Sequence, residues 1–126
     1  MAAAKLRVPV LVGPTAVGKT ATALALAAHW PLDVVSADSR QVYRRLDIGT
    51  AKPTRKERAR VPHHGLDLIE PGHRYSAGRF ARDATGWITD IAGRGRMPVV
   101  VGGTGFYVRA LAEGLFHEPP LDGDRG

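Results

Sequence analysis

The chain has 126 residues, a formal net charge of +6 and a hydrophobic content of 44%, which suits one domain with a real core. It contains no cysteine, which excludes disulfides and thiolate metal sites, and no run approaches the roughly 18 apolar residues of a membrane span. We therefore expect a cytoplasmic protein without a membrane partner, and we take a monomer as the default.

The predicted elements alternate between strand and helix along the chain. Residues 6–12 form a short apolar run before Gly13 that predicts a buried strand. Residues 18–29 predict a helix that Pro31 stops, and residues 33–36 and 97–101 predict two further strands. Residues 106–115 predict a last helix. Ahead of the third strand, apolar residues recur at helical spacing and predict one core-facing side, formed by Phe80, Ala84, Trp87, Ile88 and Ile91.

This alternation predicts an α/β fold, a parallel sheet with helices on both faces like that of P-loop NTPases. Three strands are few for such a sheet, so we expect the sheet to be incomplete in this chain. We interpret residues 1–117 as the N-terminal part of a P-loop catalytic core. Residues 118–126 are rich in polar residues, proline and glycine and are interpreted as a tail.

Positive charge is concentrated in residues 40–60. This segment holds eight basic and two acidic residues, a surplus as large as that of the whole chain. Such a cluster attracts polyanions and fits a nucleic-acid partner. It also fits a solvated helix that follows Pro53 and has Thr54 as its cap. Charge alone leaves both interpretations open.

One motif matches the pattern G-x-x-x-x-G-K-[ST] between a predicted strand and a predicted helix. Its glycines let the backbone curl so that several N–H groups point at phosphate oxygens. Lys19 adds a full positive charge, and the Thr20 hydroxyl is placed to hold Mg²⁺. The chain is therefore predicted to bind a phosphorylated ligand. The motif consists of Gly13, Pro14, Thr15, Ala16, Val17, Gly18, Lys19 and Thr20.

The motif does not select the reaction. In phosphoryl transfer the loop stabilises the charge of the transferred group. In alkyl transfer from a diphosphate, the bond to carbon breaks and the same cradle stabilises the departing pyrophosphate. Both chemistries remain open on the motif alone.

Polar or glycine-rich residues also follow the other two strands, and in open α/β sheets ligands bind at this edge. Asp38 follows the second strand and fits three interpretations: a metal carboxylate, a general base or a helix cap. The turn at Gly102 lacks the third glycine of a dinucleotide fingerprint, so it is either a tight turn or a substrate contact. His63 and His64 are adjacent in an extended segment and point to opposite faces, so we expect no metal site there.

Six strings in series resemble the bacterial tRNA dimethylallyltransferase (tRNA isopentenyltransferase) family over nearly the whole chain. The strings are the phosphate loop, Asp38-Ser39-Arg40-Gln41-Val42-Tyr43, Leu46-Asp47-Ile48-Gly49-Thr50-Ala51-Lys52-Pro53, Val61-Pro62-His63-His64, Arg74-Tyr75-Ser76-Ala77-Gly78 with Phe80, and Gly102-Gly103-Thr104-Gly105 with Tyr107. The phosphate loop alone is common, but the whole series is specific.

The resemblance implies dimethylallyl diphosphate, the anticodon arm of tRNA and Mg²⁺ as partners. The product would carry a dimethylallyl group on N6 of the adenosine just 3′ of the anticodon. On this reading, residues 15–20 hold the diphosphate and Asp38 is the general base. The adenine, flipped out of the RNA, would meet Asp38, Ser39, Arg40 and Gln41, and Thr104 would lie against the tRNA.

The chain departs from the family pattern in two ways. Arg45 stands where the family usually has glycine, which concerns a local turn. Family members are typically more than twice as long, and we expect their helical insertion, which clamps the anticodon arm, to begin near residues 118–126.

Three other functions fit parts of the sequence pattern. An adenylate isopentenyltransferase would prenylate free AMP, ADP or ATP. A small-molecule P-loop kinase would release ADP instead of transferring a prenyl group. A non-catalytic module would bind phosphate or RNA only.

Overall fold

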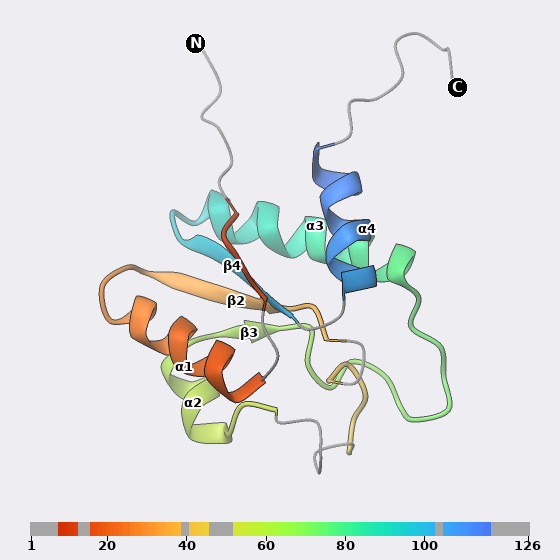
Figure 1. Cartoon of the computed structure of the whole chain (residues 1–126), viewed down its shortest axis with the longest axis horizontal. Helices are drawn as coiled ribbons and strands as arrows, with labels where there is room; N and C mark the ends of the chain where they lie inside the picture. The colour runs from red at the N-terminus through yellow and green to blue at the C-terminus, as the bar shows by residue number, and fades with distance from the viewer. Residues whose placement is uncertain (1–7, 13–15, 39–40, 46–51, 103–104, 117–126) are drawn as a thin grey trace, which may run out of the picture.

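The computed structural model describes residues 8–12, 16–38, 41–45, 52–102 and 105–116. Its elements in chain order are β1 (Val10–Val12), α1 (Ala16–Ala27), β2 (Leu32–Ser36), α2 (Arg55–Arg60), β3 (His63–His64), α3 (Ala77–Gly93), β4 (Met97–Gly102) and α4 (Gly105–Phe116) (Figure 1). The predicted tail at residues 118–126 lies outside the described residues. Among the helices described, none is long and apolar enough to cross a membrane.

The four strands form one parallel sheet in the order β1-β4-β2-β3. The β2 and β4 strands pair over five positions, from Leu32 opposite Met97 to Ser36 opposite Val101. The predicted parallel α/β fold is confirmed. The strand β3 was not predicted, because two histidines carry neither the length nor the apolar alternation of a strand signal.

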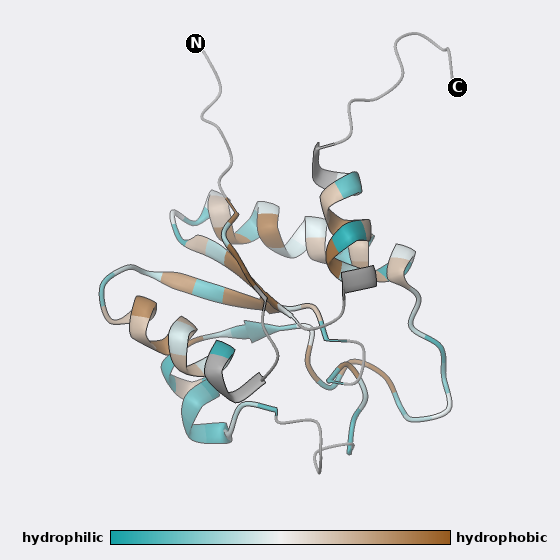
Figure 2. Ribbon diagram, viewed as in Figure 1, coloured by the Kyte–Doolittle hydropathy of each residue, from teal (hydrophilic) through white to brown (hydrophobic). Residues whose placement is uncertain are grey.

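Helices cover both faces of the sheet, as the sequence predicts (Figure 1). Alternate residues of β2 and β4 enter different cores. Val34 and Val99 pack on the face that carries α1, whereas Val35 and Val100 pack on the face that carries α3 and α4. Figure 2 shows the apolar colouring along β2 and β4 that this two-sided burial requires.

The apolar side predicted for residues 80–91 is confirmed in α3. Phe80, Ala84, Ile88 and Ile91 are buried in this helix. The Phe80 ring stacks on Tyr107 of α4, with ring centroids 4.8 Å apart. These contacts fix α3 and α4 against each other on one face of the sheet.

A buried carboxylate holds the amino ends of the strands together. Asp33 in β2 has a side chain that is only 1% exposed. Arg96 Nε donates to its Oδ1 at 2.6 Å, and Arg94 Nη2 donates to its Oδ2 at 3.1 Å. His64 Nε2 lies 3.0 Å from the same Oδ2. Burial by itself raises the pKa of Asp33, but the hydrogen bonds from His64, Arg96 and Arg94 outweigh it and lower that pKa below 3.8.

We predict that Asp33→Asn lowers the free energy of unfolding at pH 7 by about 2 kcal/mol, because the amide cannot form the charge-assisted hydrogen bonds to Arg94 and Arg96. The loss stays moderate because both arginines are partly exposed and can be hydrated by water instead. The folded pKa lies below the unfolded one, so the stabilisation is present above pH 3.8 and is lost as the pH falls through the folded value. The difference between wild type and variant should therefore shrink toward pH 3. Urea unfolding at pH 7, 4 and 3 measures it. Equal stability at pH 7 would contradict this account.

Candidate functional site

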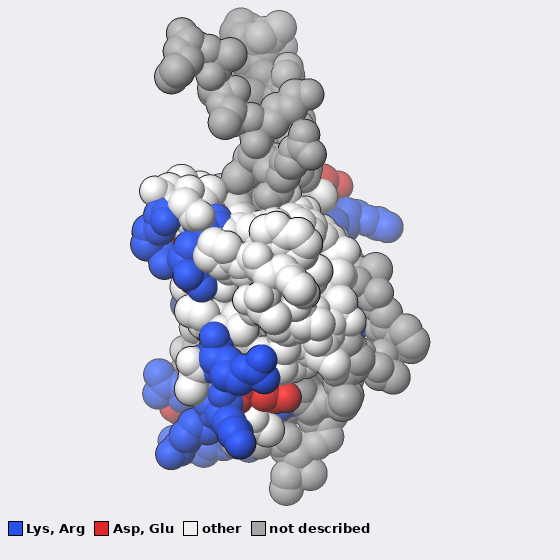
Figure 3. Space-filling view, turned by 90° about the vertical axis from the view of Figure 1, so that its left-hand side faces the viewer, with Lys and Arg blue, Asp and Glu red and all other residues white. Residues whose placement is uncertain are grey.

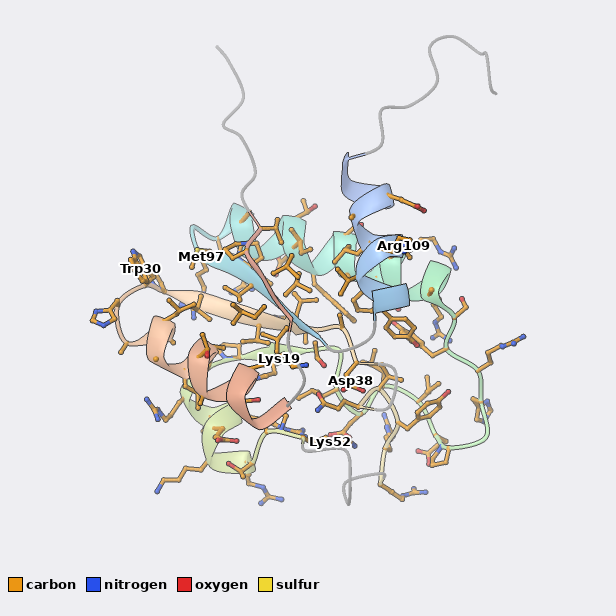
Figure 4. All side chains as sticks on the ribbon, in the orientation of Figure 1. Lys19, Trp30, Asp38, Lys52, Met97 and Arg109 are labelled. Atoms are coloured by element: carbon orange, nitrogen blue, oxygen red, sulfur yellow. The ribbon has the colours of Figure 1, made fainter. Side chains whose placement is uncertain are left out.

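The carboxyl ends of the strands meet at one cleft on the face that carries α1. The cleft is open to solvent, and the space between its walls, including the open mouth, is about 360 Å³. In Figure 4, Lys19 and Asp38 lie at this end of the sheet, and Trp30 and Met97 mark the opposite end. Its lining residues are Lys19, Thr20, Ala23, Val34, Ser36, Asp38, Gln41, Pro53, His63, Val101 and Gly102.

The phosphate-loop part of the cleft comes from the start of α1, which begins at Ala16. The first backbone N–H groups of a helix have no partner within it, and the helix dipole makes this end positive. Lys19, 9% exposed, adds its ammonium group to the same end of the cleft, beside Thr20. This combination attracts an anion. Of the predicted loop, Gly13, Pro14 and Thr15 lie outside the described residues, and Ala16, Val17 and Gly18 are described as the first helical turn.

The end of β2 places Asp38 and Gln41 on the cleft. The Ser36 hydroxyl donates to Gln41 Oε1 at 3.0 Å in a buried contact. The Gln41 N–H donates to the Asp38 carbonyl at 3.2 Å, which closes a turn. Residues 41–45 are not helical, so the interpretation of Asp38 as a helix cap is wrong. Ser39 and Arg40 lie outside the described residues.

The end of β4 approaches the end of β2 so closely that glycine is required. A Cβ atom on Gly102 would lie 2.7 Å from both the Cβ and the carbonyl oxygen of Ala37. The Ala37 N–H donates to the Val101 carbonyl at 2.8 Å, which holds the two strand ends together. Gly102 therefore sets the width of the cleft beside Asp38. Thr104 lies outside the described residues.

Six lining residues were not predicted as site residues: Ala23, Val34, Ser36, Pro53, His63 and Val101. Burial lowers the pKa of His63, so its ring is neutral at pH 7. His63 Nδ1 lies 2.7 Å from the Val61 carbonyl, which can only accept; Nδ1 therefore carries the proton and Nε2 is an acceptor. His63 lines the cleft while His64 contacts Asp33, so the two histidines face opposite ways. Among the described residues, no three His, Cys, Asp or Glu side chains are grouped to hold a metal.

A second network fixes the wall that carries Pro53. Lys52, whose side chain is 3% exposed, donates from Nζ to Asp67 Oδ1 at 2.5 Å and to the Tyr43 carbonyl at 2.6 Å. Arg58 Nη1 donates to Asp67 Oδ2 at 2.8 Å. The Asp67 N–H donates to the Gln41 carbonyl at 3.0 Å. Burial raises the pKa of Asp67, but its bonds from Lys52 and Arg58 bring that pKa below its ordinary value. Asp67 therefore contacts Gln41 through its backbone N–H, and its ionised carboxylate binds Lys52 and Arg58.

Two family profiles match the chain: IPP transferase over residues 41–124 and isopentenyl transferase over residues 6–63. The chain belongs to the IPP transferase family. It is 57% identical to tRNA dimethylallyltransferase 1 of Syntrophotalea carbinolica over 115 residues, which are 91% of this chain and 36% of that protein. It is also 57% identical to the tRNA dimethylallyltransferase of Anaeromyxobacter dehalogenans, over 93% of this chain and 39% of that protein.

Solved structures agree with this IPP transferase assignment. The tRNA isopentenylpyrophosphate transferase of Bacillus halodurans superposes with a TM-score of 0.83 at 47% identity, over 90% of this chain and 38% of that one. A eukaryotic dimethylallyltransferase described as acting on tRNA gives a TM-score of 0.79 at 36% identity, over 85% of this chain and 27% of that one. The chain thus spans less than two fifths of the length of these relatives.

We predict that Gly102→Ala destabilises the protein by about 1–3 kcal/mol, because the new methyl group meets the backbone of Ala37 and forces the strand ends apart. Thermal and urea unfolding measure the effect. The matched control is Gly86→Ala in α3, where a Cβ meets nothing within 4 Å. That change should stabilise by about 0.5–1 kcal/mol, as alanine is the better helix former. Equal effects at the two glycines would refute the close-approach argument.

Proposed function

We propose that this chain forms the phosphate-loop region of an enzyme that transfers a dimethylallyl group from dimethylallyl diphosphate to tRNA. The acceptor is N6 of the adenosine just 3′ of the anticodon. The observation that carries the proposal is the shared cleft: an anion-binding helix start with Lys19 lies beside Asp38 and Gln41. The family to which the chain belongs supplies the prenyl chemistry.

The anion-binding end of the cleft suits the leaving group. In this reaction the bond between the allylic carbon and the diphosphate oxygen breaks, and pyrophosphate departs with the electron pair. Lys19 and the N–H groups at the start of α1 offset that growing negative charge. Thr20 lies next to them on the cleft wall.

Asp38 suits the acceptor side of the reaction. An exocyclic adenine amine is a weak nucleophile because its lone pair is delocalised into the ring. A carboxylate that takes the N6 proton as the carbon–nitrogen bond forms raises its reactivity. The adenine must leave the RNA stack to reach this position. Gln41, held by Ser36, lies beside Asp38 and is placed to contact the base.

The cleft also fits Mg²⁺, which takes oxygen ligands, usually one or two from the protein together with substrate phosphates. The Thr20 hydroxyl lines the cleft, with the Ser36 hydroxyl and the Asp38 carboxylate on the same lining. We propose Thr20 as the protein ligand of the ion. When bound, Mg²⁺ would neutralise part of the charge on the diphosphate.

We predict that the intact enzyme transfers label from dimethylallyl diphosphate to an anticodon stem-loop and that Lys19→Ala slows this transfer by about 10²–10³-fold, the loss of one electrostatic stabiliser. Arg82→Ala removes the same charge from the exposed side of α3 and should leave the rate unchanged. Label transfer to AMP instead of the stem-loop, or release of ADP from ATP with no prenyl transfer, would overturn the proposed function.

We predict that Asp38→Asn lowers the transfer rate by roughly 10²-fold or more, because the amide cannot accept the N6 proton. Pyrophosphate affinity should change little. Asp90→Asn, which removes an exposed carboxylate from α3, serves as the control. Recovery of activity in Asp38→Asn at raised Mg²⁺ concentration would assign Asp38 to the metal and refute its role as the base.

A further inference from the structure

The short helix α2 carries several positive charges that form no ion pair within the described part of the chain. Arg55, Lys56 and Arg60 are exposed, and no acidic residue in the described part of the chain pairs with them. We call these three residues the α2 basic surface. Figure 3 shows Lys and Arg side chains gathered over the lower part of one side of the molecule, where α2 lies in Figure 1.

Several other cations of the structure form ion pairs within the fold. Arg94 and Arg96 pair with Asp33, and Arg44 and Arg45 pair with Glu70. Within α2 itself, Arg58 pairs with Asp67. The α2 basic surface differs because its three charges, unpaired among the described residues, lie within one helix of six residues, where they repel one another. An external anion bound at this surface would offset that repulsion.

The α2 helix is held firmly, although it has no buried residue. A capping box closes its start: the Thr54 hydroxyl accepts from the Glu57 N–H at 3.1 Å, and Glu57 accepts from the Thr54 N–H at 2.8 Å. The capping box uses two of the N–H groups at the helix start, so we assign anion binding to the exposed side chains of this helix. Arg58 Nε donates to the Pro53 carbonyl at 3.1 Å, which fixes the helix to the preceding segment.

The α2 basic surface meets the cleft through Arg55. Pro53 lines the cleft and also lines a neighbouring hollow, whose other walls are Lys52, Thr54, Arg55, Arg58 and Asp67. This hollow carries three cations and one carboxylate, so its net charge is positive. A polyanion that places one residue in the cleft can therefore run directly over α2.

We propose that the α2 basic surface binds the sugar–phosphate backbone of the RNA whose adenine enters the cleft. The inference rests on the proposed function, since it names where that substrate runs. Exposed Arg and Lys side chains contact phosphates independently of sequence and fix the register of a nucleic acid. The surface offers no apolar side chain for insertion into a membrane, and its position beside the cleft favours a chain that also supplies the acceptor base.

The test compares two charge-matched triple variants of the 126-residue chain. One replaces Arg55, Lys56 and Arg60 with Gln. The other replaces Arg74 in the loop before α3, Arg82 in α3 and Arg109 in α4 with Gln. Fluorescence anisotropy with a labelled anticodon stem-loop is recorded from low to high salt. Pyrophosphate binding is titrated in parallel and also checks that each variant is folded.

We expect the α2 variant to bind RNA about tenfold more weakly or worse and to lower the salt slope by about two, while the control changes little. Pyrophosphate affinity should be the same in all three proteins. Equal losses in both variants would show that only net charge matters and would overturn the inference while the proposed function stands. Loss of pyrophosphate binding in the α2 variant would assign the surface to the diphosphate. Failure of the wild-type chain to bind the stem-loop would overturn the inference, whereas the proposed function is tested separately by label transfer in the intact enzyme.

Discussion

The parallel pairing of β2 with β4 is the interaction on which the rest of the structure depends. Each of these strands sends alternate side chains into the two cores, so the pairing fixes both helix layers at once. It also brings the end of β4 against the end of β2, where the contact between Gly102 and Ala37 leaves no space for a side chain. The position of Asp38 beside the start of α1 follows from this register. The chemistry of the cleft is thus set by backbone geometry as much as by its polar side chains.

Much of this arrangement could be predicted from the sequence, because the deciding signals are local. The phosphate-loop pattern, the apolar spacing in residues 80–91 and the Thr54 cap each lie within one element. The rule that parallel strands end at the same edge then predicts that Lys19, Thr20, Asp38 and Gln41 share a site. The structure places them on one cleft, whereas their chemical roles stay predictions.

The features that escaped prediction are those that depend on distant contacts. Ser36 looked like the end of a buried strand, and only its bond to Gln41 shows that it supports the cleft wall. The two-residue strand β3 is a strand only because β2 lies beside it. Arg45 stands where the family usually has glycine, and its φ of 65° is a backbone conformation that favours glycine. The positive φ explains the usual glycine at this turn. An ion pair with Glu70 at 2.8 Å accompanies this conformation.

The register of β1 has a consequence for how the protein forms during synthesis. Val10 pairs with Val100, so ninety residues must be added to the nascent chain after Val10 before its partner exists. At bacterial or eukaryotic elongation rates this wait lasts on the order of 5–20 s. During that time β1 lacks its partner in the described sheet. The segment after Val10 is therefore made early, but the strand that supports β1 in the sheet is made late.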